Sequence, residues 1–435
     1  METLAEYLNA VRTGGLNSTL RTLYGESAVD VQAHRYQNLL ARMDGWTSGS
    51  HAVLVTAPGR TELGGNHTDH NNGVVLAAAV HFDCLAVASP VDGTTIRIRS
   101  EGFPDIIEVE LDDLGHRKEE EGTSTALVRG VLAGFKSGGW NIGAFDACIS
   151  GNVPVGAGLS SSAAFEICLG QILNHLFNAG EVFPLGLAVI GRKAENVHFG
   201  KPCGFMDQIA CAAQGILSID FHDQTDPKLQ EVEFDFSDNG YQLAVVDTGG
   251  SHADLTPEYA AIPEEMKLAA RVFGQDYARG LKMQQVLDAA TQIRSVAGDR
   301  ALLRLIHFIE ENERAILQAD ALRSGDMERY LELVNASGDS SWRLLQNCVS
   351  TTNFMDQGIP LALTLTERFL EGKGAWRVQG GGFAGTIQAY VPNERFEEYR
   401  IFMDEFFGVG STLPLLVRKP GNEYIRPDKT EEMGG

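Results

Sequence analysis

The sequence predicts an α+β fold, because strand-like and helical stretches dominate different parts of the chain. Short β-rich runs alternate with glycine-rich turns through the first half, whereas residues 264–348 carry Ala, Leu, Glu and Arg at helical spacing. Residues 376–391 return to a strand-like pattern around a glycine cluster. This distribution lacks the regular alternation of a doubly wound sheet. At 435 residues the chain exceeds one compact core, so we expect two domains, residues 1–215 and residues 216–435.

The composition is that of a soluble globular protein, with 43% hydrophobic and 21% charged residues. The net charge of −23 would repel nucleic acids and anionic membranes at long range, so we expect neither as a partner. Six cysteines without a CxxC pair are typical of reduced thiols. The N-terminus lacks a basic segment, and the longest apolar run, residues 74–80, is too short to cross a bilayer. We therefore expect a cytoplasmic protein without a membrane anchor, and we take a monomer as its expected state.

Three predicted strands lead toward the segments that carry the chemistry. Residues 53–56 run into a glycine-rich turn, residues 74–89 form a long β-rich stretch, and residues 145–150 lead into a serine-rich loop. The helix after that loop is predicted to run to Phe177, because apolar residues recur along one of its faces. Two polar loops are therefore expected to begin where strands end.

The segment from Pro154 to Ala164, here called the serine loop, has the makeup of a phosphate-binding segment. Gly156 and Gly158 allow the backbone to fold closely around an anion. Three small hydroxyl residues, at positions 160–162, leave the first N–H groups of the following helix open to it. An ordinary serine cap at a helix start would use the same residues, so this segment alone leaves both interpretations open.

Neither of two common nucleotide-binding motifs fits this sequence in its proper context. No GxxxxGK[ST] occurs, which argues against a P-loop. Residues 380–385, here called the glycine cluster, do fit GxGxxG, but a strand-like stretch follows at residues 386–391, where a dinucleotide site requires a helix. We therefore interpret the glycine cluster as a bend between two strands.

A second dense polar segment covers residues 59–71 and is here called the polar loop. It places Arg60, several hydrogen-bonding side chains and two carboxylates in one glycine-punctuated stretch, a composition suited to binding a polyol. A metal site is the second interpretation, with His67, Asp69 and His70 as ligands, although no cysteine or fourth ligand lies nearby. A solvated loop is the third. The flanking apolar stretches favour a loop held against the core, and therefore a functional one.

Asp207 belongs to a third segment, residues 201–208, which includes one glycine. The aspartate lies among Met, Phe, Ile and Cys residues, where a carboxylate is costly unless it is paired or used. A buried helix cap would explain the aspartate equally well. This segment alone therefore leaves the role of Asp207 open.

Taken together and in this order, these segments resemble the galactokinase family, within the superfamily of galactose, homoserine, mevalonate and phosphomevalonate kinases. Residues 59–73 resemble the family signature, residues 154–164 the ATP loop, residues 203–208 the segment with the catalytic aspartate, and residues 380–385 the third motif. Residues 247–259 are similar to the region that supplies a sugar-contacting tyrosine. The resemblance implies a two-domain fold with helices packed on mixed β-sheets and an active site in the cleft between the domains.

The resemblance also assigns roles to individual residues. It implies that Asp207 accepts or orients the proton of the anomeric hydroxyl, while Arg60 keeps Asp207 ionised and stabilises the transferred phosphoryl group. It implies that Glu195 and Ser162 are the protein ligands of Mg²⁺. The residues expected to cradle ATP are Gly156, Gly158, Leu159, Ser160, Ser161 and Ser162. The residues expected to bind the sugar are Asn66, His67, Asp69, Gly204 and Tyr259.

The activity implied by the resemblance is transfer of the γ-phosphate of ATP to the anomeric hydroxyl of galactose, giving galactose 1-phosphate. Asn66 departs from the family, which usually has a glutamate that contacts the C6 end of the sugar. A neutral amide would tolerate a carboxylate there, whereas a glutamate would repel it. Galacturonate, or another sugar modified at C6, is therefore the alternative substrate.

Two further alternatives come from relatives of the family. Some relatives bind sugar and ATP but act as non-catalytic sensors and can lose residues from the serine loop, whereas residues 160–164 are complete here. Mevalonate- and homoserine-type kinases share chiefly the serine loop and lack the signature at residues 67–69. Residues 260–265 replace an arginine-rich stretch of the family, so the resemblance does not predict how they fold.

Overall fold

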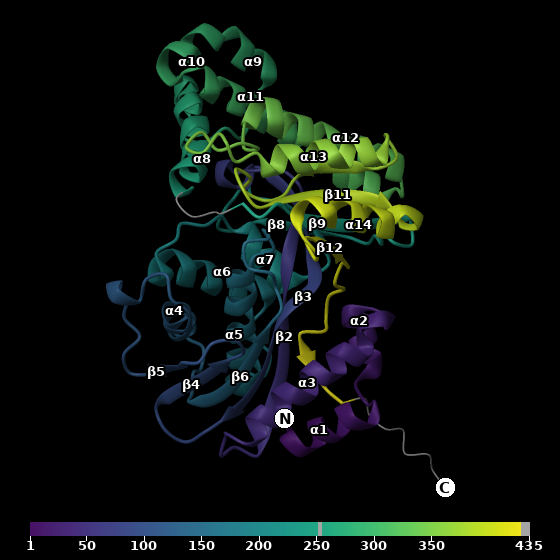
Figure 1. The fold of residues 1–435 in the computed structure, drawn as a ribbon. Coiled ribbons are helices and arrows are strands. Elements are labelled where there is room, and N and C mark those ends of the chain that lie inside the picture. Colours follow the sequence, from purple (N-terminus) through teal and green to yellow (C-terminus); the bar gives the residue numbers. More distant parts are fainter. Residues whose placement is uncertain (251–254, 428–435) are drawn as a thin grey trace.

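The computed structural model describes residues 1–250 and 255–427 and contains two β-sheets with helices packed on them (Figure 1). Nine strands form the larger sheet and four form the smaller one. Most neighbouring strands are antiparallel, but one pair in the larger sheet is parallel. The expected α+β class with mixed sheets is therefore confirmed.

The strands of the larger sheet come from both ends of the chain as well as from its first half. They are β1 (Glu2–Thr3), β2 (His51–Gly64), β3 (Val74–Pro90), β4 (Thr95–Ser100), β5 (Ile106–Glu110), β6 (Phe145–Gly151), β7 (Ile216–Asp220), β8 (Lys228–Val232) and β13 (Tyr424–Ile425). Hydrogen bonds order them β1-β2-β3-β6-β4-β5, with β13 beside β2, β7 beside β3 and β8 beside β7. This sheet therefore extends past residue 215, and the division of the chain at that residue stays a prediction.

The smaller sheet is built from the second half of the chain. Its strands are β9 (Tyr241–Asp247), β10 (Ala375–Val378), β11 (Thr386–Pro392) and β12 (Thr412–Leu415), in the antiparallel order β10-β11-β9-β12. The glycine cluster connects β10 to its antiparallel neighbour β11. Its interpretation as a bend between two strands is confirmed.

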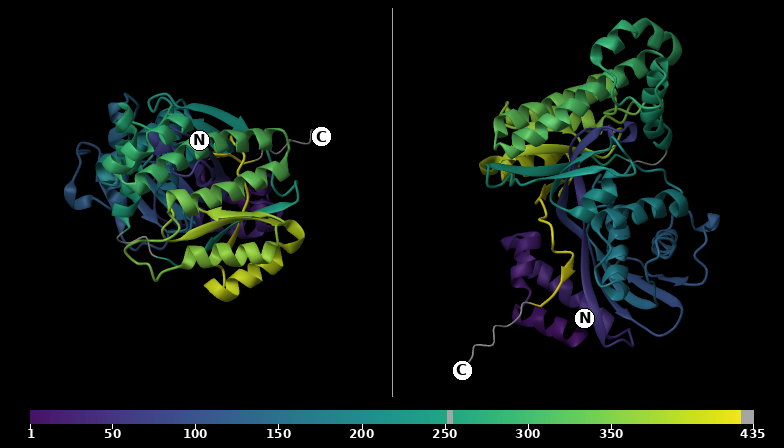
Figure 2. Two further views of the ribbon diagram at one scale, coloured as in Figure 1. Left: turned by 90° about the horizontal axis from the view of Figure 1, so that it is seen from above. Right: turned by 180° about the vertical axis from the view of Figure 1, so that it is seen from behind.

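Helices cover both faces of the larger sheet (Figure 2). One face carries α1 (Leu4–Thr13), α2 (Asn17–Tyr24) and α3 (Val29–Asp44), and the other carries α4 (Ser124–Ser137), α5 (Ser161–Phe177), α6 (Pro184–Lys193) and α7 (Met206–Ala213). Alternate residues of β2 serve the two sides, because Val53 and Val55 pack with α4–α7 whereas Leu54 packs with α1–α3. The sheet is buried on both faces, which explains its continuous apolar runs. The predicted helix ending at Phe177 is confirmed as α5.

The helical region predicted for residues 264–348 is confirmed and begins earlier than expected. It comprises α8 (Thr256–Ala270), α9 (Met283–Asp288), α10 (Ala290–Ala297), α11 (Asp299–Arg323) and α12 (Met327–Ser340). Residues 260–265 lie inside α8, which accommodates Pro263 in its interior. Two further helices, α13 (Gly358–Leu370) and α14 (Phe396–Phe407), pack on the smaller sheet.

The long strands β2 and β3 connect the two halves of the molecule (Figure 1). The register between them shifts between Pro58 and Arg60 and again between Glu62 and Gly64. Such bulges bend a strand and redirect its side chains. The far end of β2 reaches α11, where Gln318 Nε2 donates to Leu63 O at 3.3 Å. Residues 59–64 were expected in the polar loop but lie within β2, because the strand continues through the two bulges instead of ending near residue 56. The remainder of the polar loop is thereby carried from the larger sheet into the second half of the molecule.

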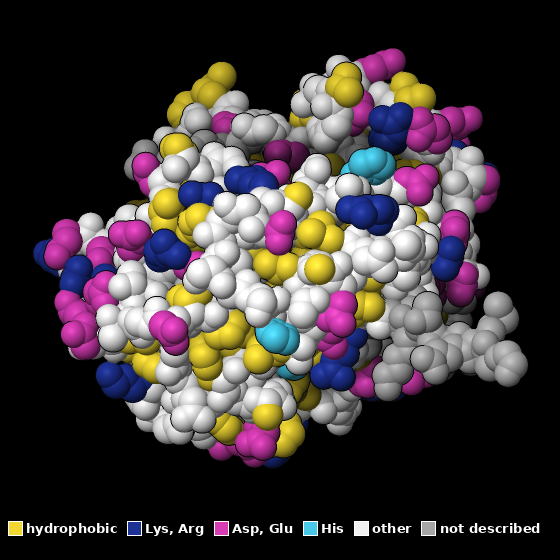
Figure 3. Space-filling view, turned by 90° about the horizontal axis from the view of Figure 1, so that it is seen from below, with side chains coloured by type: hydrophobic (Ala, Val, Ile, Leu, Met, Phe, Trp, Pro, Cys, Tyr) yellow, Lys and Arg dark blue, Asp and Glu magenta, His cyan; other side chains and the backbone are white. Residues whose placement is uncertain are grey.

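Among the described residues, the helices show no candidate membrane span, and the face shown in Figure 3 carries no basic binding patch. Within residues 1–250 and 255–427, none of the helices combines the length and apolar character needed to cross a membrane. On the face shown in Figure 3, Lys and Arg side chains are scattered among acidic and apolar ones. The basic side chains of that face therefore form no single patch.

Candidate active site

Asp207 lies at the start of α7 and is contacted by side chains from two other segments. Arg60, from β2, approaches Asp207 Oδ1 through Nε at 2.8 Å and through Nη2 at 2.7 Å. Ser160 Oγ donates a hydrogen bond to Asp207 Oδ2 at 2.5 Å. Asp207 is also in the first turn of α7, the helix end that favours negative charge. The structure therefore brings the polar loop, the serine loop and the third segment together at one carboxylate.

This surrounding keeps the Asp207 carboxylate ionised. Burial alone would raise its pKa, but the Arg60 charge and the hydrogen bonds from Ser160 and Arg60 outweigh burial and hold the pKa below its usual value. The Asp207 side chain is still 32% exposed and is therefore open to the outside of the protein. Arg60 is buried and donates through Nη1 to Gly158 O at 2.5 Å.

The serine loop is held from two sides by strands that are distant in sequence. The Arg60 N–H on β2 donates to Leu159 O at 3.0 Å. Thr386 Oγ1 on β11 lies 3.3 Å from Ala157 O and donates to it. Because β2 belongs to the larger sheet and β11 to the smaller, the serine loop lies where the two sheets approach each other.

The backbone of the serine loop has the shape expected of an anion cradle. Gly156 and Gly158 have φ angles of +83° and +64°, which glycine adopts without strain. Ser160 has a φ of +59°, a left-handed conformation that costs energy for a residue with a Cβ and is concentrated at functional loops. The helix α5 begins at the next residue, so its first N–H groups are left without partners inside the helix. The alternative of an ordinary serine cap is not supported, since Ser160 donates its side chain to Asp207 instead of capping the helix.

Glu195 and Ser162 lie side by side at the start of α5. Ser162 Oγ donates to Glu195 Oε1 at 3.0 Å, and Lys201 Nζ lies 3.5 Å from the same oxygen. Gln208 Nε2 donates to the other carboxylate oxygen at 2.8 Å. Glu195 belongs to a π-helical turn, Ala194–Phe199, and such turns are frequent at functional sites. The two residues expected to hold Mg²⁺ are thus neighbours, with hard oxygen atoms.

Gly204 lies directly against Asp69 of the polar loop. A Cβ built on Gly204 would come within 2.1 Å of Asp69 Oδ2, so only glycine permits this approach. The other oxygen of Asp69 accepts the N–H of His70 at 2.9 Å. Since Gly204 is only three residues from Asp207, this contact places Asp69 close to the segment that carries the Asp207 carboxylate.

His67 and Tyr259 both contact the backbone of the glycine cluster. His67 Nε2 donates to Gly381 O at 3.0 Å, and burial lowers the pKa of His67 to about 4, so its ring is neutral at pH 7. Tyr259, on α8, donates its hydroxyl to Gly382 O at 2.9 Å.

Residues 251–254, part of the region similar to the family's tyrosine segment, lie outside the described residues. Among the residues that are described, no group of three or more His, Cys, Asp or Glu side chains is arranged to hold a metal ion.

Asn66 is fully buried, and protein groups use its side-chain amide. Asn66 Nδ2 donates to Glu62 Oε1 at 2.9 Å and to Gly380 O at 2.7 Å. Asn66 Oδ1 accepts from Asn347 Nδ2 at 2.9 Å and from Ser341 Oγ at 3.3 Å. The side chain therefore faces the protein interior. A direct contact with sugar would require some of these bonds to break, and that expected contact stays a prediction.

Comparison with known proteins agrees with the resemblance of the motifs. Residues 47–90 match the galactokinase galactose-binding signature, and residues 126–215 match the GHMP kinase N-terminal domain. The galactokinase of Mannheimia succiniciproducens is 32% identical over 80% of this chain and 87% of that protein. The galactokinase of Actinobacillus pleuropneumoniae serotype 5b is 32% identical over 81% of this chain and 88% of its own. This chain belongs to the galactokinase family.

Solved structures of the GHMP kinase superfamily share the fold of this galactokinase-family chain. A galactokinase from Lactococcus lactis, crystallised with galactose, matches 94% of this chain and 99% of its own with a TM-score of 0.74 at 23% identity. A mevalonate kinase from Methanococcus jannaschii matches 86% of this chain and all of its own with a TM-score of 0.60 at 15% identity. At these identities the likeness establishes the fold alone. The mixed sheets with packed helices that the motifs imply are thus confirmed, whereas the division into two domains with a cleft between them stays a prediction.

A buried ion pair between Glu62 and Arg377 was not anticipated from the sequence. Arg377 Nη2 lies 2.5 Å from Glu62 Oε1, and both side chains are almost inaccessible. Gln388 Nε2 donates to Glu62 O at 3.1 Å, which ties the same strand to β11. A carboxylate in apolar surroundings does signal a partner, at Glu62 as at Asp207. The partner, however, lies 315 residues away, and no pattern in the sequence points to it.

Proposed function

We propose that this chain is an ATP-dependent kinase that transfers the γ-phosphate of ATP to the anomeric hydroxyl of galactose, giving galactose 1-phosphate. The curated relatives that it resembles are named galactokinase. The single observation that carries the proposal is the ionised Asp207, which Arg60 and Ser160 hold at the meeting point of the serine loop and the polar loop.

In this proposal Asp207 positions the reacting hydroxyl. Phosphoryl transfer requires an oriented nucleophile and neutralisation of charge on the transferring group. A carboxylate has about four acceptor sites, so the contacts from Arg60 and Ser160 leave Asp207 able to accept a hydroxyl proton. Because its pKa is below the usual value, Asp207 is reliably ionised but a weak base, and its positioning role outweighs proton abstraction. Arg60 supplies positive charge where negative charge develops.

ATP would bind along the serine loop, with its phosphates on the backbone N–H groups of residues 156–162 and at the start of α5. The adjacent hydroxyl of Ser162 and carboxylate of Glu195 fit Mg²⁺, which prefers hard oxygen ligands and completes its shell with water and phosphate oxygens. When bound, the ion would neutralise charge on the phosphates. Lys201, close to Glu195, adds a cation near the same place.

The sugar would lie against Asp69, Gly204 and Asp207, with His67 and Tyr259 fixing the surrounding backbone. Galacturonate is the second candidate substrate, and Asn66 is the observation that favours it. The buried amide of Asn66, however, is already bonded to Glu62 and Gly380, so it is not free to contact the C6 end of a sugar. For this reason we propose galactose as the substrate and galacturonate as the competing one.

A panel of sugars tests this proposal, with ADP release as the readout. The panel includes galactose, galacturonate and glucose, each assayed with the wild-type chain and with Asp207→Asn as the inactive control. We expect efficient, Mg²⁺-dependent turnover of galactose only. Efficient turnover of galacturonate with none of galactose would overturn the substrate assignment, and binding of galactose and ATP without ADP release would identify a sensor.

We also propose that the protein acts as a monomer in the cytoplasm. All six cysteines are free thiols in the structure, as expected for a reducing compartment. Light scattering after gel filtration should give a mass near 47.1 kDa, the mass of one chain. A mass near twice this value would contradict the monomer.

A further inference from the structure

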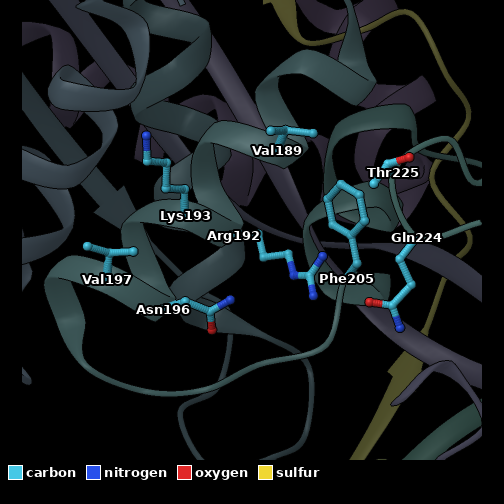
Figure 4. A pocket seen from close by; sticks show the side chains of 8 residues that line it. All are labelled: Val189, Arg192, Lys193, Asn196, Val197, Phe205, Gln224 and Thr225. Carbon is cyan, nitrogen blue, oxygen red and sulfur yellow. The ribbon is translucent and has the colours of Figure 1, made fainter. Parts of the chain in front are cut away.

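A pocket of about 430 Å³ lies beside α6 and the π-helical turn (Figure 4). Its volume is in the range of small-molecule binding sites. None of its lining residues is among those expected to bind sugar, ATP or Mg²⁺. The polar residues that line it are Arg192, Lys193, Asn196, Gln224 and Thr225.

Arg192 gives the pocket a fixed cation with an unused donor. Its guanidinium carbon lies 5.0 Å from the centre of the Phe205 ring, a cation–π contact that orients the group. Its Nε is buried and has no hydrogen-bond partner among the described residues. Because Nε is closed off from solvent, a ligand in the pocket would be received by the terminal Nη1 and Nη2 groups of Arg192.

The neighbours of Arg192 indicate what kind of acceptor fits. In Figure 4 the amides of Asn196 and Gln224 lie on either side of Arg192, whereas Lys193 points away from it. Asp223, next to Gln224 in sequence, accepts the N–H and the hydroxyl of Thr225 at 2.8 and 2.7 Å. A guanidinium matches the oxygens of a phosphate group, and the flanking amides match hydroxyl groups.

Two residues that line this pocket also form hydrogen bonds to segments of the proposed sugar site. Gln224 Nε2 donates to Asp69 O at 3.3 Å and to Asn72 Oδ1 at 3.0 Å. On the opposite wall, Asn196 Oδ1 accepts the N–H of Cys203 at 2.7 Å, directly before Gly204. A ligand oxygen that takes the Gln224 amide therefore competes with the loop that carries Asp69.

We propose that this pocket binds a phosphate-bearing small molecule, of the size of a sugar phosphate, and that its binding weakens sugar binding at Asp69. The bound phosphate pairs with Arg192, and the rest of the ligand contacts the amides and Thr225. Coupling between two sites is reciprocal, so bound sugar weakens the second ligand by the same factor. The inference rests on the proposed sugar site but not on catalysis.

Binding calorimetry on the full chain tests the site, with the active site filled by galactose and a non-hydrolysable ATP analogue so that the titrants cannot bind there. The bound galactose lowers the affinity of each titrant for the pocket by the same coupling factor, so the order of their affinities is unchanged. The titrants are galactose 1-phosphate, inorganic phosphate and neutral methyl galactoside. We expect galactose 1-phosphate and inorganic phosphate to bind and methyl galactoside not to bind. Tighter binding of galactose 1-phosphate than of inorganic phosphate identifies a sugar phosphate as the ligand. Equal binding of the two identifies free phosphate. Arg192→Gln should weaken binding at least tenfold, whereas Arg368→Gln, a change of an exposed arginine on α13, should not. No binding by the wild type, or equal binding by Arg192→Gln, overturns the proposal.

A second variant and a second measurement guard against a folding defect. Val197→Glu adds a carboxylate at an exposed position of the pocket and should also weaken phosphate binding, with an unchanged melting temperature. The affinity for galactose, measured without ATP, should fall several-fold when phosphate saturates the wild-type pocket and stay constant in Arg192→Gln. A galactose affinity that ignores saturating phosphate overturns the coupling. An inactive protein that still binds phosphate through Arg192 would contradict the proposed function alone.

Discussion

Strand β2 contributes one partner to each of two carboxylate–guanidinium pairs, Arg60 with Asp207 and Glu62 with Arg377. The Asp207 side chain is 32% exposed, whereas that of Glu62 is 5% exposed. The pKa of Asp207 is lowered, because its donors and Arg60 outweigh burial. The pKa of Glu62 is raised, because burial outweighs the charges of Arg377 and Arg60. The pKa values of the two carboxylates thus shift in opposite directions because the two groups differ in access to solvent and in the number of hydrogen-bond donors.

The two pairs accordingly serve different ends. Asp207 stays charged and accessible, as a group that meets a substrate must. Glu62, on β2, is buried against Arg377 of β10 and accepts a hydrogen bond from Asn66 Nδ2, which holds the polar loop in place. Removing a group from the first pair is expected to affect turnover, and removing one from the second is expected to affect stability.

Replacement of Asp207 should have the largest effect. Asp207→Ala should lower kcat by about 10²–10⁴-fold and leave ATP binding intact, because it removes the group that positions the hydroxyl but not the serine loop. ADP release and nucleotide titration measure the two quantities, with Asp226→Asn, an exposed aspartate, as the control. Turnover close to that of the wild type would show that Asp207 does not act on the hydroxyl.

Replacement of Arg377 should lower the stability of the folded protein. Arg377→Met should lower the free energy of unfolding by about 3–5 kcal/mol, because it leaves the Glu62 charge buried without its partner. The double variant Glu62→Gln/Arg377→Met should recover part of this loss. Urea unfolding measures the change, with Arg329→Met, from an exposed ion pair, as a control that changes little. If the double variant is as unstable as the single one, the pair is not the cause.

Removal of the Ser160 hydroxyl should have a smaller effect on turnover. Ser160→Ala removes one donor from Asp207 and leaves Arg60 in place, so kcat/KM should fall about tenfold, in line with a hydrogen bond to a charged group. Ser161→Ala is the matched control, because it keeps the backbone N–H that is proposed to face phosphate. Equal losses in the two variants would contradict the specific role of Ser160.

The pH dependence of stability should show the smallest effect, with opposite signs for the two carboxylates. The lowered pKa of Asp207 means that its ionised form stabilises the fold above its ordinary pKa of 3.8, and this contribution is lost as the pH falls through the lower folded value. The raised pKa of Glu62 means that its contribution is present below the ordinary pKa of 4.5 and is lost as the pH rises through the higher folded value.

Melting temperatures of the wild type, Asp207→Asn and Glu62→Gln measure these contributions between about pH 3 and about pH 7. As the pH falls, the melting temperature of the wild type should decrease relative to that of Asp207→Asn. Over the same range it should increase relative to that of Glu62→Gln. Shifts of the same sign in both variants would remove the distinction between the two pairs.

Much of the local structure was predictable from the sequence. The helix after the serine loop ends at Phe177 as its apolar spacing predicts, and the strand after the glycine cluster excludes a dinucleotide site. These features depend on periodicity and backbone preference within about 20 residues. The grouping of Arg60, Ser160 and Asp207 came from the resemblance of three motifs and agrees with the contacts in the structure.

The sequence by itself therefore determined the types of element, the family and the segments that meet at Asp207. Only the tertiary structure decided that Asn66 is buried, that Glu62 pairs with Arg377, and that strands beyond residue 215 belong to the larger sheet. The physical reason is that burial and ion pairing depend on which distant segments pack together. Such contacts leave no periodic trace in the chain, whereas the spacing of apolar residues along a helix or strand does.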